Sequence, residues 1–311
     1  MATKANHHFV PQFYLREFAD GVGRKAKVFT FDSETKKSFT TLVRNVGSKR
    51  HFNRIEVDGV DPNALEDAFS EMEAEISVHL REVVEARAFP SDEHFTSIMN
   101  LMAHLSVRNP RLRQNMEGFH REIVQRIMHL TLESEERWKS QTDQMKAQGI
   151  PVRDDVSFED VKAFHESGQY DILIDQTHLI GLELKMLDPV LERLAARKWC
   201  FASASGGAEY ITSDDPVVLS WTDDRDTGPY SPGHGLRGTL VTFTLCPTLA
   251  LVGAFEDLPE SITHLPPMVT GINTHIARYS TKQIYANNPN FRVNLRDVEN
   301  VLGSDLHRLM K

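Results

Sequence analysis

Residues 25–46 read KAKVFTFDSETKKSFTTLVRNV, with apolar and polar residues alternating on both sides of a DSETKK turn. This period of two predicts a β-hairpin. The period then changes, because DPNALEDAFSEMEAEISVHLREVVEA (61–86) has apolar residues at helical spacing. Asp61 suits the cap of that helix and Pro62 its first position. The chain is therefore expected to begin with strands and to continue into helices.

Helical patterns continue to residue 197, with a second helix starting near Ser91 and a break at Pro110. From 198 onward the pattern consists of short β-rich runs separated by Gly, Asp and Pro, and 295–310 again looks helical. This order predicts an α+β fold in one domain over 1–311. We expect a mixed or antiparallel sheet, built from 1–60 and 198–290 around the mostly helical 61–197.

The composition describes a globular chain of 311 residues, 40% hydrophobic and 25% charged. No stretch approaches the roughly twenty apolar residues of a membrane span, and MATKANHH lacks the apolar run of a signal peptide. Cys200 and Cys246 are the only cysteines, which favours reduced, buried thiols in a cytoplasmic protein. The nucleotide-binding motif GxxxxGK[ST], the hydrolase motif GxSxG and the zinc motif HExxH are absent.

The net charge of −9 is unevenly distributed. Residues 1–54 contain eleven Lys or Arg and four acids, a net charge of +7, so 55–311 carry −16. Clustered cations attract phosphates, but lysine is also common on edge strands that must avoid aggregation. The basic segment is therefore either an anion-facing surface or a solvated hairpin.

Three stretches carry polar groups beyond what a scaffold needs. In NHHFVPQFYL (6–15), an extended chain would place His8, Gln12 and Tyr14 on one face, where they could read a base or position a sugar. A helix after Pro11 would destroy this alignment. A histidine among apolar residues is otherwise a satisfied core residue.

The second stretch, EYITSDDPVVL (209–219), has a strand that must bend or end at Ser213-Asp214-Asp215-Pro216. Carboxylates at a strand end often project into a pocket, although the same residues are good turn formers. The third stretch, VRNPRLR (107–113), has three arginines at a helix break. Their guanidinium groups suit phosphates, or they form structural ion pairs with acidic helices, which we favour for Arg113.

In the quoted order, HHFVPQFYLREFA, VRNPRLR and YITSDDPVVL resemble a bacterial family labelled domain of unknown function 4238, over essentially the whole chain. The family usually has Thr-Ser-Asp-Asn-Pro where this chain has Asp215, which leaves Asp214 as the better catalytic candidate. Through members that act as DNA glycosylases in phage defence, the resemblance implies removal of a modified base, such as glucosylated hydroxymethylcytosine, from double-stranded phage DNA. The products would be the free base and an abasic site.

That chemistry needs a flipped base and a fixed carboxylate that stabilises positive charge on the sugar. The resemblance implies no metal or other cofactor, and it suggests the following roles. The catalytic residues are Asp214, Asp215 and His8; the base or its sugar is bound by His7, Gln12, Tyr14 and Ser213; and DNA phosphates are bound by Arg44, Lys49, Arg50, Arg108 and Arg111.

Two other functions stay open. A metal-dependent nuclease or phosphoesterase would use ligands from His7, His8, His51, Asp214 and Asp215, and sensitivity to EDTA would distinguish it. A non-enzymatic phage sensor would bind without forming product. Its interface could be the methionine-rich helical faces, although these are more simply explained as core (Met99, Met102, Met116 and Met128). The preferred base, RNA as a substrate, lyase activity and the oligomeric state stay undetermined.

Overall fold

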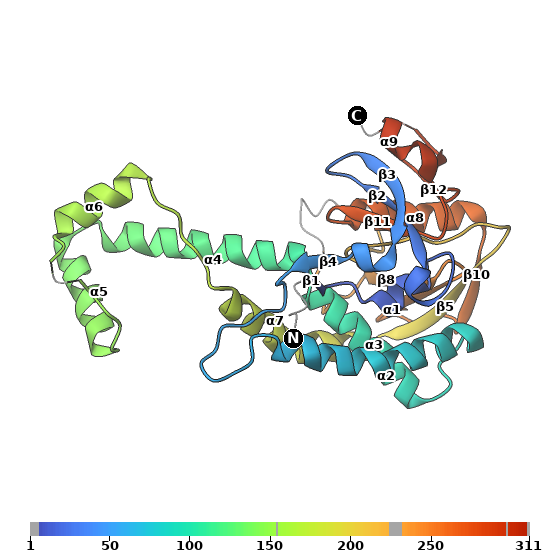
Figure 1. Cartoon of the computed structure of the whole chain (residues 1–311), viewed down its shortest axis with the longest axis horizontal. Coiled ribbons are helices and arrows are strands. Elements are labelled where there is room, and N and C mark those ends of the chain that lie inside the picture. The colour runs from blue at the N-terminus through green and yellow to red at the C-terminus, as the bar shows by residue number, and fades with distance from the viewer. Residues whose placement is uncertain (1–5, 154, 224–231, 297, 310–311) are drawn as a thin grey trace. The chain divides into compact units, whose positions relative to one another are not determined.

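The computed structural model describes residues 6–153, 155–223, 232–296 and 298–309 (Figure 1). The chain divides into two compact units, one formed by 1–111 with 180–311 and the other by 112–179. The fold is α+β, as predicted, with helices α2 to α7 in the middle of the sequence and strands before and after them. The extent of a single domain over 1–311 stays a prediction.

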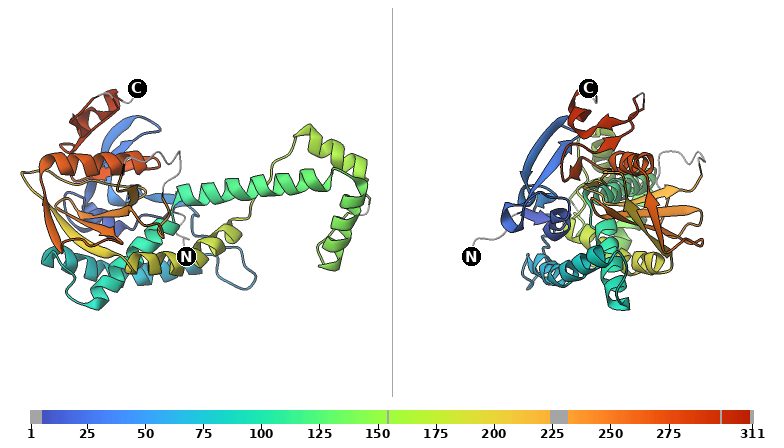
Figure 2. Two further views of the ribbon diagram at one scale, coloured as in Figure 1. Left: turned by 180° about the vertical axis from the view of Figure 1, so that it is seen from behind. Right: turned by 90° about the vertical axis from the view of Figure 1, so that its right-hand side faces the viewer.

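A four-stranded antiparallel sheet in the first unit joins the two ends of the chain. Its order is β3 (Lys37–Leu42), β2 (Lys27–Asp32), β11 (Gln283–Ala286) and β6 (Thr212–Ser213). In Figures 1 and 2 the blue N-terminal hairpin lies beside the orange to red C-terminal part. The predicted assembly of a sheet from both ends of the sequence is confirmed.

The predicted hairpin is closed by its own turn residues. Both the backbone N–H and the hydroxyl of Thr35 donate to Asp32 Oδ1, at 2.8 and 2.9 Å, and Lys36 takes a positive φ of 56°. The other carboxylate oxygen, Asp32 Oδ2, accepts from Gln283 Nε2 at 2.7 Å. The turn carboxylate therefore also ties the hairpin to β11.

A second sheet in this unit has five strands and mixed direction. Only β10 and β5 are parallel, and the other neighbours are antiparallel. The strands, in spatial order, are β10 (Ser261–His264), β5 (Lys198–Ala204), β9 (Leu249–Ala254), β8 (Thr239–Cys246) and β7 (Val217–Trp221). Cys200 and Cys246 are free and buried in it, as the sequence predicts.

Two short ribbons and several helices complete the first unit. The antiparallel ribbons are β1 (Asn6–His8) with β4 (Ser48–Arg50) and β12 (Arg292–Val293) with β13 (Val301–Leu302). The helices are α1 (Gln12–Arg16), α2 (Ala64–Ala86), α3 (Asp92–Val107), α8 (Pro266–Tyr279) and α9 (Leu306–Leu309). Short 3₁₀ turns lie at Gly23–Lys25, Val43–Asn45 and Gly303–Asp305.

Helix boundaries follow the sequence closely in two places and differ in one. α3 begins directly after Ser91 and α4 (Pro110–Thr131) begins at Pro110, as predicted. The helix expected from Asp61 begins only at Ala64. The Asp61 carboxylate instead accepts the backbone N–H of Asn63 at 2.8 Å, which makes a turn before the helix.

The helix predicted over 295–310 is wrong for most of its length. Val301 pairs with Val293 in β13, and only the four residues of α9 are α-helical. Gly303 lies against the Phe291 ring, where a Cβ would come within 2.3 Å of the ring. Burial against Phe291 and Val293 therefore overrides the local helical pattern.

The second unit, over its described residues, is helical. It contains α5 (Glu135–Ala147) and α6 (Phe158–Ser167) together with most of α4, while α7 (Gln176–Ala195) begins at its end. Ser134 and Ser157 cap α5 and α6 by accepting backbone N–H groups three residues later. No helix in the described part of the chain is long and apolar enough to cross a membrane.

Buried aromatic and aliphatic side chains fix the sheets and helices of the first unit. Phe29 and Phe31 from β2 pack with Ile284 from β11 and Ile276 from α8 in one core cluster. Met99 and Met102 on α3 are fully buried, so their helical face is core. Met116 and Met128, in the second unit, are half-buried.

Candidate functional site

The first motif is not extended over its whole length. Asn6–His8 forms β1, whereas Gln12–Arg16 forms the short helix α1 directly after Pro11. His8, Gln12 and Tyr14 therefore do not form the polar line expected for an extended segment. The helix forms because Pro11 accepts from Leu15 N–H through its carbonyl while the missing N–H of proline is not needed at a helix start.

Tyr14 is fully buried and joins the first motif to the second. Its hydroxyl donates to the Thr244 carbonyl at 2.8 Å and lies 2.6 Å from Thr212 Oγ1. The ring stacks on Phe243 with centroids 5.1 Å apart. Burial raises the pKa of Tyr14 further above its usual value. In this arrangement Tyr14 is a neutral structural phenol with no surface for a substrate.

The two histidines of the first motif have different environments. His7 is fully buried, and its Nδ1 accepts the backbone N–H of Asn53 at 2.9 Å. His8 is half-buried, and its Nε2 has no hydrogen-bond partner among the described residues. Burial lowers the pKa of His8, against the opposing charge of Glu66. The lowered pKa favours the neutral imidazole, and its unpartnered Nε2 is enclosed in the protein.

Asp214, the leading catalytic candidate, is saturated by the backbone. Its Oδ1 accepts from Thr281 N–H at 2.9 Å, and its Oδ2 accepts from Lys282 and Gln283 N–H at 2.8 and 2.9 Å. The side chain is buried. Burial raises the pKa of Asp214, and the three N–H groups oppose that rise. The carboxylate clamps the entry to β11 and offers no oxygen free of such bonds.

Asp215 and Arg111 bring the second and third motifs together. The Asp215 side chain is 2% exposed and is ion-paired with Arg111, whose side chain is 31% exposed. Arg111 also donates to the Tyr279 carbonyl at 2.8 Å and lies over the Tyr279 ring. Burial raises the pKa of Asp215 to about 7, although Arg111 lowers it, and Asp214 raises it further. Such a group exchanges protons near neutral pH.

Ser213 completes the turn without a free hydroxyl. Its Oγ donates to the Asp215 carbonyl at 2.9 Å and accepts the Asp215 N–H at 3.1 Å, so it serves the turn geometry that the sequence also allowed. Gln12 is half-buried, and its amide oxygen lies 3.4 Å from Arg16.

The five arginines and lysines expected at DNA phosphates separate into three environments. Arg44, Lys49 and Arg50 are exposed on and beside β4. Arg108 is 4% exposed and lies 3.3 Å from the centre of the Phe69 ring. Arg108 is thus enclosed in the protein, and its phosphate-binding role stays a prediction. Arg111 is the only partly exposed member that meets the second motif.

The ligands suggested for a metal-dependent nuclease are not gathered. Among the described residues, one group of at least three His, Cys, Asp or Glu side chains could hold a metal ion, and it consists of His79, Glu82 and His94. It contains none of the suggested donors (His7, His8, His51, Asp214 and Asp215).

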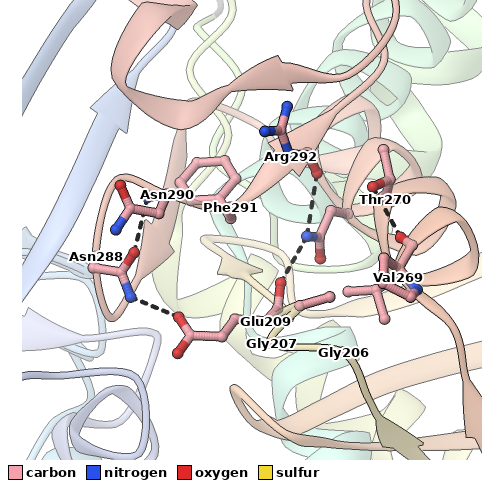
Figure 3. A pocket seen from close by; sticks show the side chains of 12 residues that line it. Gly206, Gly207, Glu209, Val269, Thr270, Asn288, Asn290, Phe291 and Arg292 are labelled. Carbon is pink, nitrogen blue, oxygen red and sulfur yellow. Dashed lines mark hydrogen bonds between the residues drawn. The ribbon is translucent and has the colours of Figure 1, made fainter.

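A polar pocket of about 260 Å³ lies beside the start of the second motif. Figure 3 shows the Glu209 carboxylate at its wall, bonded to Asn288 Nδ2 at 2.6 Å, with Gly206 and Gly207 near its edge. Asn273 supports the wall by donating to the Glu209 and Arg292 carbonyls. The carboxylate and amides suit a polar ligand that both donates and accepts hydrogen bonds.

A larger pocket of about 500 Å³ is lined by Phe31 and Ile284. Arg278, Lys282 and Arg296 also line it. Alternate residues of a strand face opposite sides, so Ile284 faces this pocket while Gln283 and Tyr285 face the buried polar groups near Asp214. Apolar walls with three cations suit an anionic ligand that carries an apolar or aromatic group.

Comparison with known proteins places these motifs in one family. The family described as "Protein of unknown function (DUF4238)" matches residues 6–290. The chain belongs to this family. The match contains all three motifs and ends before β12. No curated protein and no solved structure matches the chain.

The fold thus joins the three DUF4238 motifs around the turn at 212–215. The first motif reaches it through Tyr14 and Thr212, and the central motif through Arg111 and Asp215. Sequence reasoning missed both pairings, because the partners are separated by about a hundred residues or more and leave no local pattern. It also gave no role to Glu209, although that residue opens the second stretch.

A series of hydrogen-bonded polar side chains near Asp214 was likewise not predicted from the sequence. The Tyr285 hydroxyl donates to Gln283 Oε1 at 2.9 Å, and Gln283 Nε2 donates to Asp32 at 2.7 Å. The backbone N–H of the same Gln283 holds Asp214. These residues meet only because β2 and β11 are neighbours, so the rigidity of the turn depends on the pairing of the two chain ends.

Proposed function

We propose that this DUF4238 protein is a DNA glycosylase that hydrolyses the N-glycosidic bond of a modified base, as the resemblance to phage-defence members implies. One observation carries the proposal. A buried carboxyl, Asp215, has its pKa raised by burial to about 7 and contacts Arg111 where the three motifs meet. General acid–base groups work best when their pKa lies near the working pH.

Asp215, rather than Asp214, is the catalytic carboxylate in this proposal. All the oxygens of Asp214 are engaged by three backbone N–H groups, and such a clamp cannot be released without disturbing the start of β11. Asp215 is held by one side chain, Arg111, which is partly exposed. A side chain can change partners when substrate binds. A backbone segment within a sheet can do so only by losing hydrogen bonds of the sheet.

The reaction breaks the bond between the sugar C1′ and the base nitrogen. The electron pair of that bond leaves with the base, and positive charge develops on the sugar. Ionised Asp215 stabilises this charge and accepts a proton from the attacking water, whose oxygen bonds to C1′. The departing base takes a proton from solvent, and Asp215 later releases its proton to solvent, so that one water is consumed and an abasic site is left. Arg111, drawn from Asp215 toward a DNA phosphate, would expose the carboxylate.

The exposed cations of the basic N-terminal segment support a DNA substrate. Arg44, Lys49 and Arg50 lie on and beside β4, next to β1 of the first motif. Phosphate contacts of this kind carry affinity without reading sequence. His8 pairs with Ser48 of β4, which places it beside these cations, although its Nε2 is buried.

Glu209 is the alternative candidate for the catalytic carboxylate, because it lines a polar pocket. Its pocket amides suit a base or an attached sugar. If Glu209 carries the chemistry, the reaction stays the same and the reacting centre moves from the turn to that pocket.

The experiment incubates the full chain with plain DNA and with phage DNA that carries glucosylated hydroxymethylcytosine. Released bases are identified by mass spectrometry, and abasic sites are counted by alkali cleavage. We expect free modified base and abasic sites with the phage DNA, with and without EDTA. Asp215→Asn should lower the rate at least about 100-fold, and Glu209→Gln should leave it near that of the unmodified chain.

Asp214→Asn is the matched control, because it alters the neighbouring carboxylate. The amide cannot accept all three N–H groups, so the variant should lose about 1–3 kcal/mol of stability while retaining activity per folded molecule. Loss of activity in Glu209→Gln alone would transfer the catalytic role to Glu209. Strand breaks abolished by EDTA would support the nuclease, and binding without any product would support the sensor.

A further inference from the structure

A cluster of three ligand-type side chains lies on α2 and α3, away from the three motifs. His79 and Glu82 are three positions apart on α2 and therefore share a face. His94 lies in the first turn of α3, which packs against α2. One ligand atom from each of His79, Glu82 and His94 lies within 4.8 Å of the others.

The two imidazoles are oriented by serine hydroxyls. His79 Nδ1 lies 2.7 Å from Ser97 Oγ, and His94 Nδ1 lies 2.7 Å from Ser91 Oγ. In each ring the serine therefore engages Nδ1, and in His94 the other nitrogen, Nε2, is directed at Glu82. Metal-binding histidines are held in the same way, because a hydrogen bond to the second nitrogen fixes the ring and its tautomer.

The ligand atoms that face one another are close enough to share a proton or a metal ion. His94 Nε2 lies 2.7 Å from the Glu82 carboxylate, and the His79 and His94 rings are 4.7 Å apart. Without a metal ion, a proton on His94 Nε2 makes this contact a hydrogen bond to Glu82; a metal ion would replace that proton and bind both atoms. A tetrahedral ion with bonds of about 2.0–2.2 Å needs ligand atoms about 3.3–3.6 Å apart. The ligand atoms here lie within 4.8 Å of one another, so small side-chain rotations would bring them to that separation.

We propose that His79, Glu82 and His94 bind a divalent transition-metal ion, with Zn²⁺ as the best fit. Two imidazoles and one carboxylate are a ligand set that Zn²⁺ takes, with water in a fourth position. Water can reach the site, because the Glu82 side chain is 51% exposed and that of His94 is 14% exposed. The ion would join α2 to the start of α3 and would stabilise their packing.

The proposal is independent of the glycosylase reaction and is tested by binding. Untagged full-length protein is freed of metal with EDTA, dialysed and titrated with ZnCl₂ by calorimetry, with Co²⁺ absorption as a second probe. We expect one equivalent of Zn²⁺ to bind and to raise the unfolding temperature, because binding to the native state alone stabilises it. Visible absorption of tetrahedral Co²⁺ should appear at the same stoichiometry.

Glu82→Gln is the decisive variant, because its exposed side chain keeps its size and should leave the fold intact. It should weaken Zn²⁺ binding at least tenfold, and so should the double variant His79→Gln/His94→Gln. Ser91→Ala and Ser97→Ala should each weaken it by about tenfold. His275→Gln, on the exposed face of α8, is the control that should bind normally.

Circular dichroism checks that each variant is folded before its affinity is compared. Saturable one-to-one binding that is lost in folded Glu82→Gln supports the site. Absence of saturable Zn²⁺ binding, or binding unchanged by Glu82→Gln, would overturn it and leave the cluster as hydrogen-bonded side chains only. Neither result depends on glycosylase activity, so the two proposals fail separately.

Discussion

At the scale of single residues, the adjacent carboxylates of the second motif have different surroundings. Asp214 faces three backbone N–H groups, while Asp215 faces the Arg111 guanidinium. Paired carboxylates whose surroundings differ in this way can serve different roles within one site. Here one carboxylate holds the backbone, and the proposed function assigns the chemistry to the other, which reverses the ranking that the family pattern suggested.

The raised pKa of Asp215 predicts a pH dependence of base excision. Only the ionised carboxylate stabilises positive charge, so kcat/KM should rise with pH through about 7, the value to which burial raises the pKa of Asp215. The same shift predicts that protonated Asp215 favours the folded state at low pH, and that this contribution is lost as pH rises through about 7. Rates of base release at several pH values would test the first prediction, and urea unfolding at the same pH values would test the second.

The matched comparison for this prediction is the residual activity of Asp215→Asn, which should lack the rise near pH 7. A rise that persists unchanged in Asp215→Asn would assign the titration to another group.

At the scale of elements, the first motif is held in place by the turn before β4. The backbone N–H groups of Phe9 and Val10 both donate to the Gly47 carbonyl, at 2.9 and 3.1 Å. Gly47 has a φ of +62°, and an added Cβ would lie 3.1 Å from Val10 Cβ and 3.2 Å from Leu15 Cδ1. This glycine therefore sets how closely β1 and α1 approach β4.

Gly47→Ala should consequently destabilise the protein more than a glycine change that adds strain alone. Gly23→Ala is the control, since Gly23 has a φ of +60° with no atom within 4 Å of an added Cβ. We expect a loss of about 1–2 kcal/mol for Gly23→Ala from the left-handed backbone. For Gly47→Ala we expect about 1–3 kcal/mol more from overpacking. Urea unfolding followed by circular dichroism measures both, and equal losses would contradict the packing argument.

At the scale of the whole molecule, charge is separated along the sequence. The net charge is −9, yet residues 1–54 carry +7. Arg44, Lys49 and Arg50 are exposed, and no salt bridge involves them within the described ranges. An acidic protein with a local cation cluster should bind DNA through that cluster only, because the remaining surface repels phosphates.

The triple change of Arg44, Lys49 and Arg50 to Ala should therefore weaken DNA binding and reduce its dependence on salt. Each phosphate contact contributes about 0.9 to the slope of log K against log salt, so the slope should fall by up to about 3. Fluorescence anisotropy with duplex DNA at several salt concentrations measures it. Changing the exposed Lys139, Lys146 and Lys185 should leave the slope unaltered, and an equal fall there would contradict a localised DNA surface.

Local patterns predicted much of the fold because they depend on neighbours within a few residues. The alternation in 25–46 and the helical spacing in 64–86 both appear in the structure as expected. The prediction fails over 295–310, where contacts of Val301 and Gly303 with β12 and Phe291 decide the conformation. A periodic pattern indicates which residues can be buried, but it does not indicate which residues they pack against.

The sequence by itself determined the α+β class, the family, and the three stretches that hold the polar groups. Only the tertiary structure decided which of those groups are free. Tyr14 meets Thr212 and Arg111 meets Asp215 across large sequence separations, whereas Asp214 is engaged by the backbone of β11. Hydrogen bonds and ion pairs depend on distance in space, and that distance is set by strand pairing between the two ends of the chain.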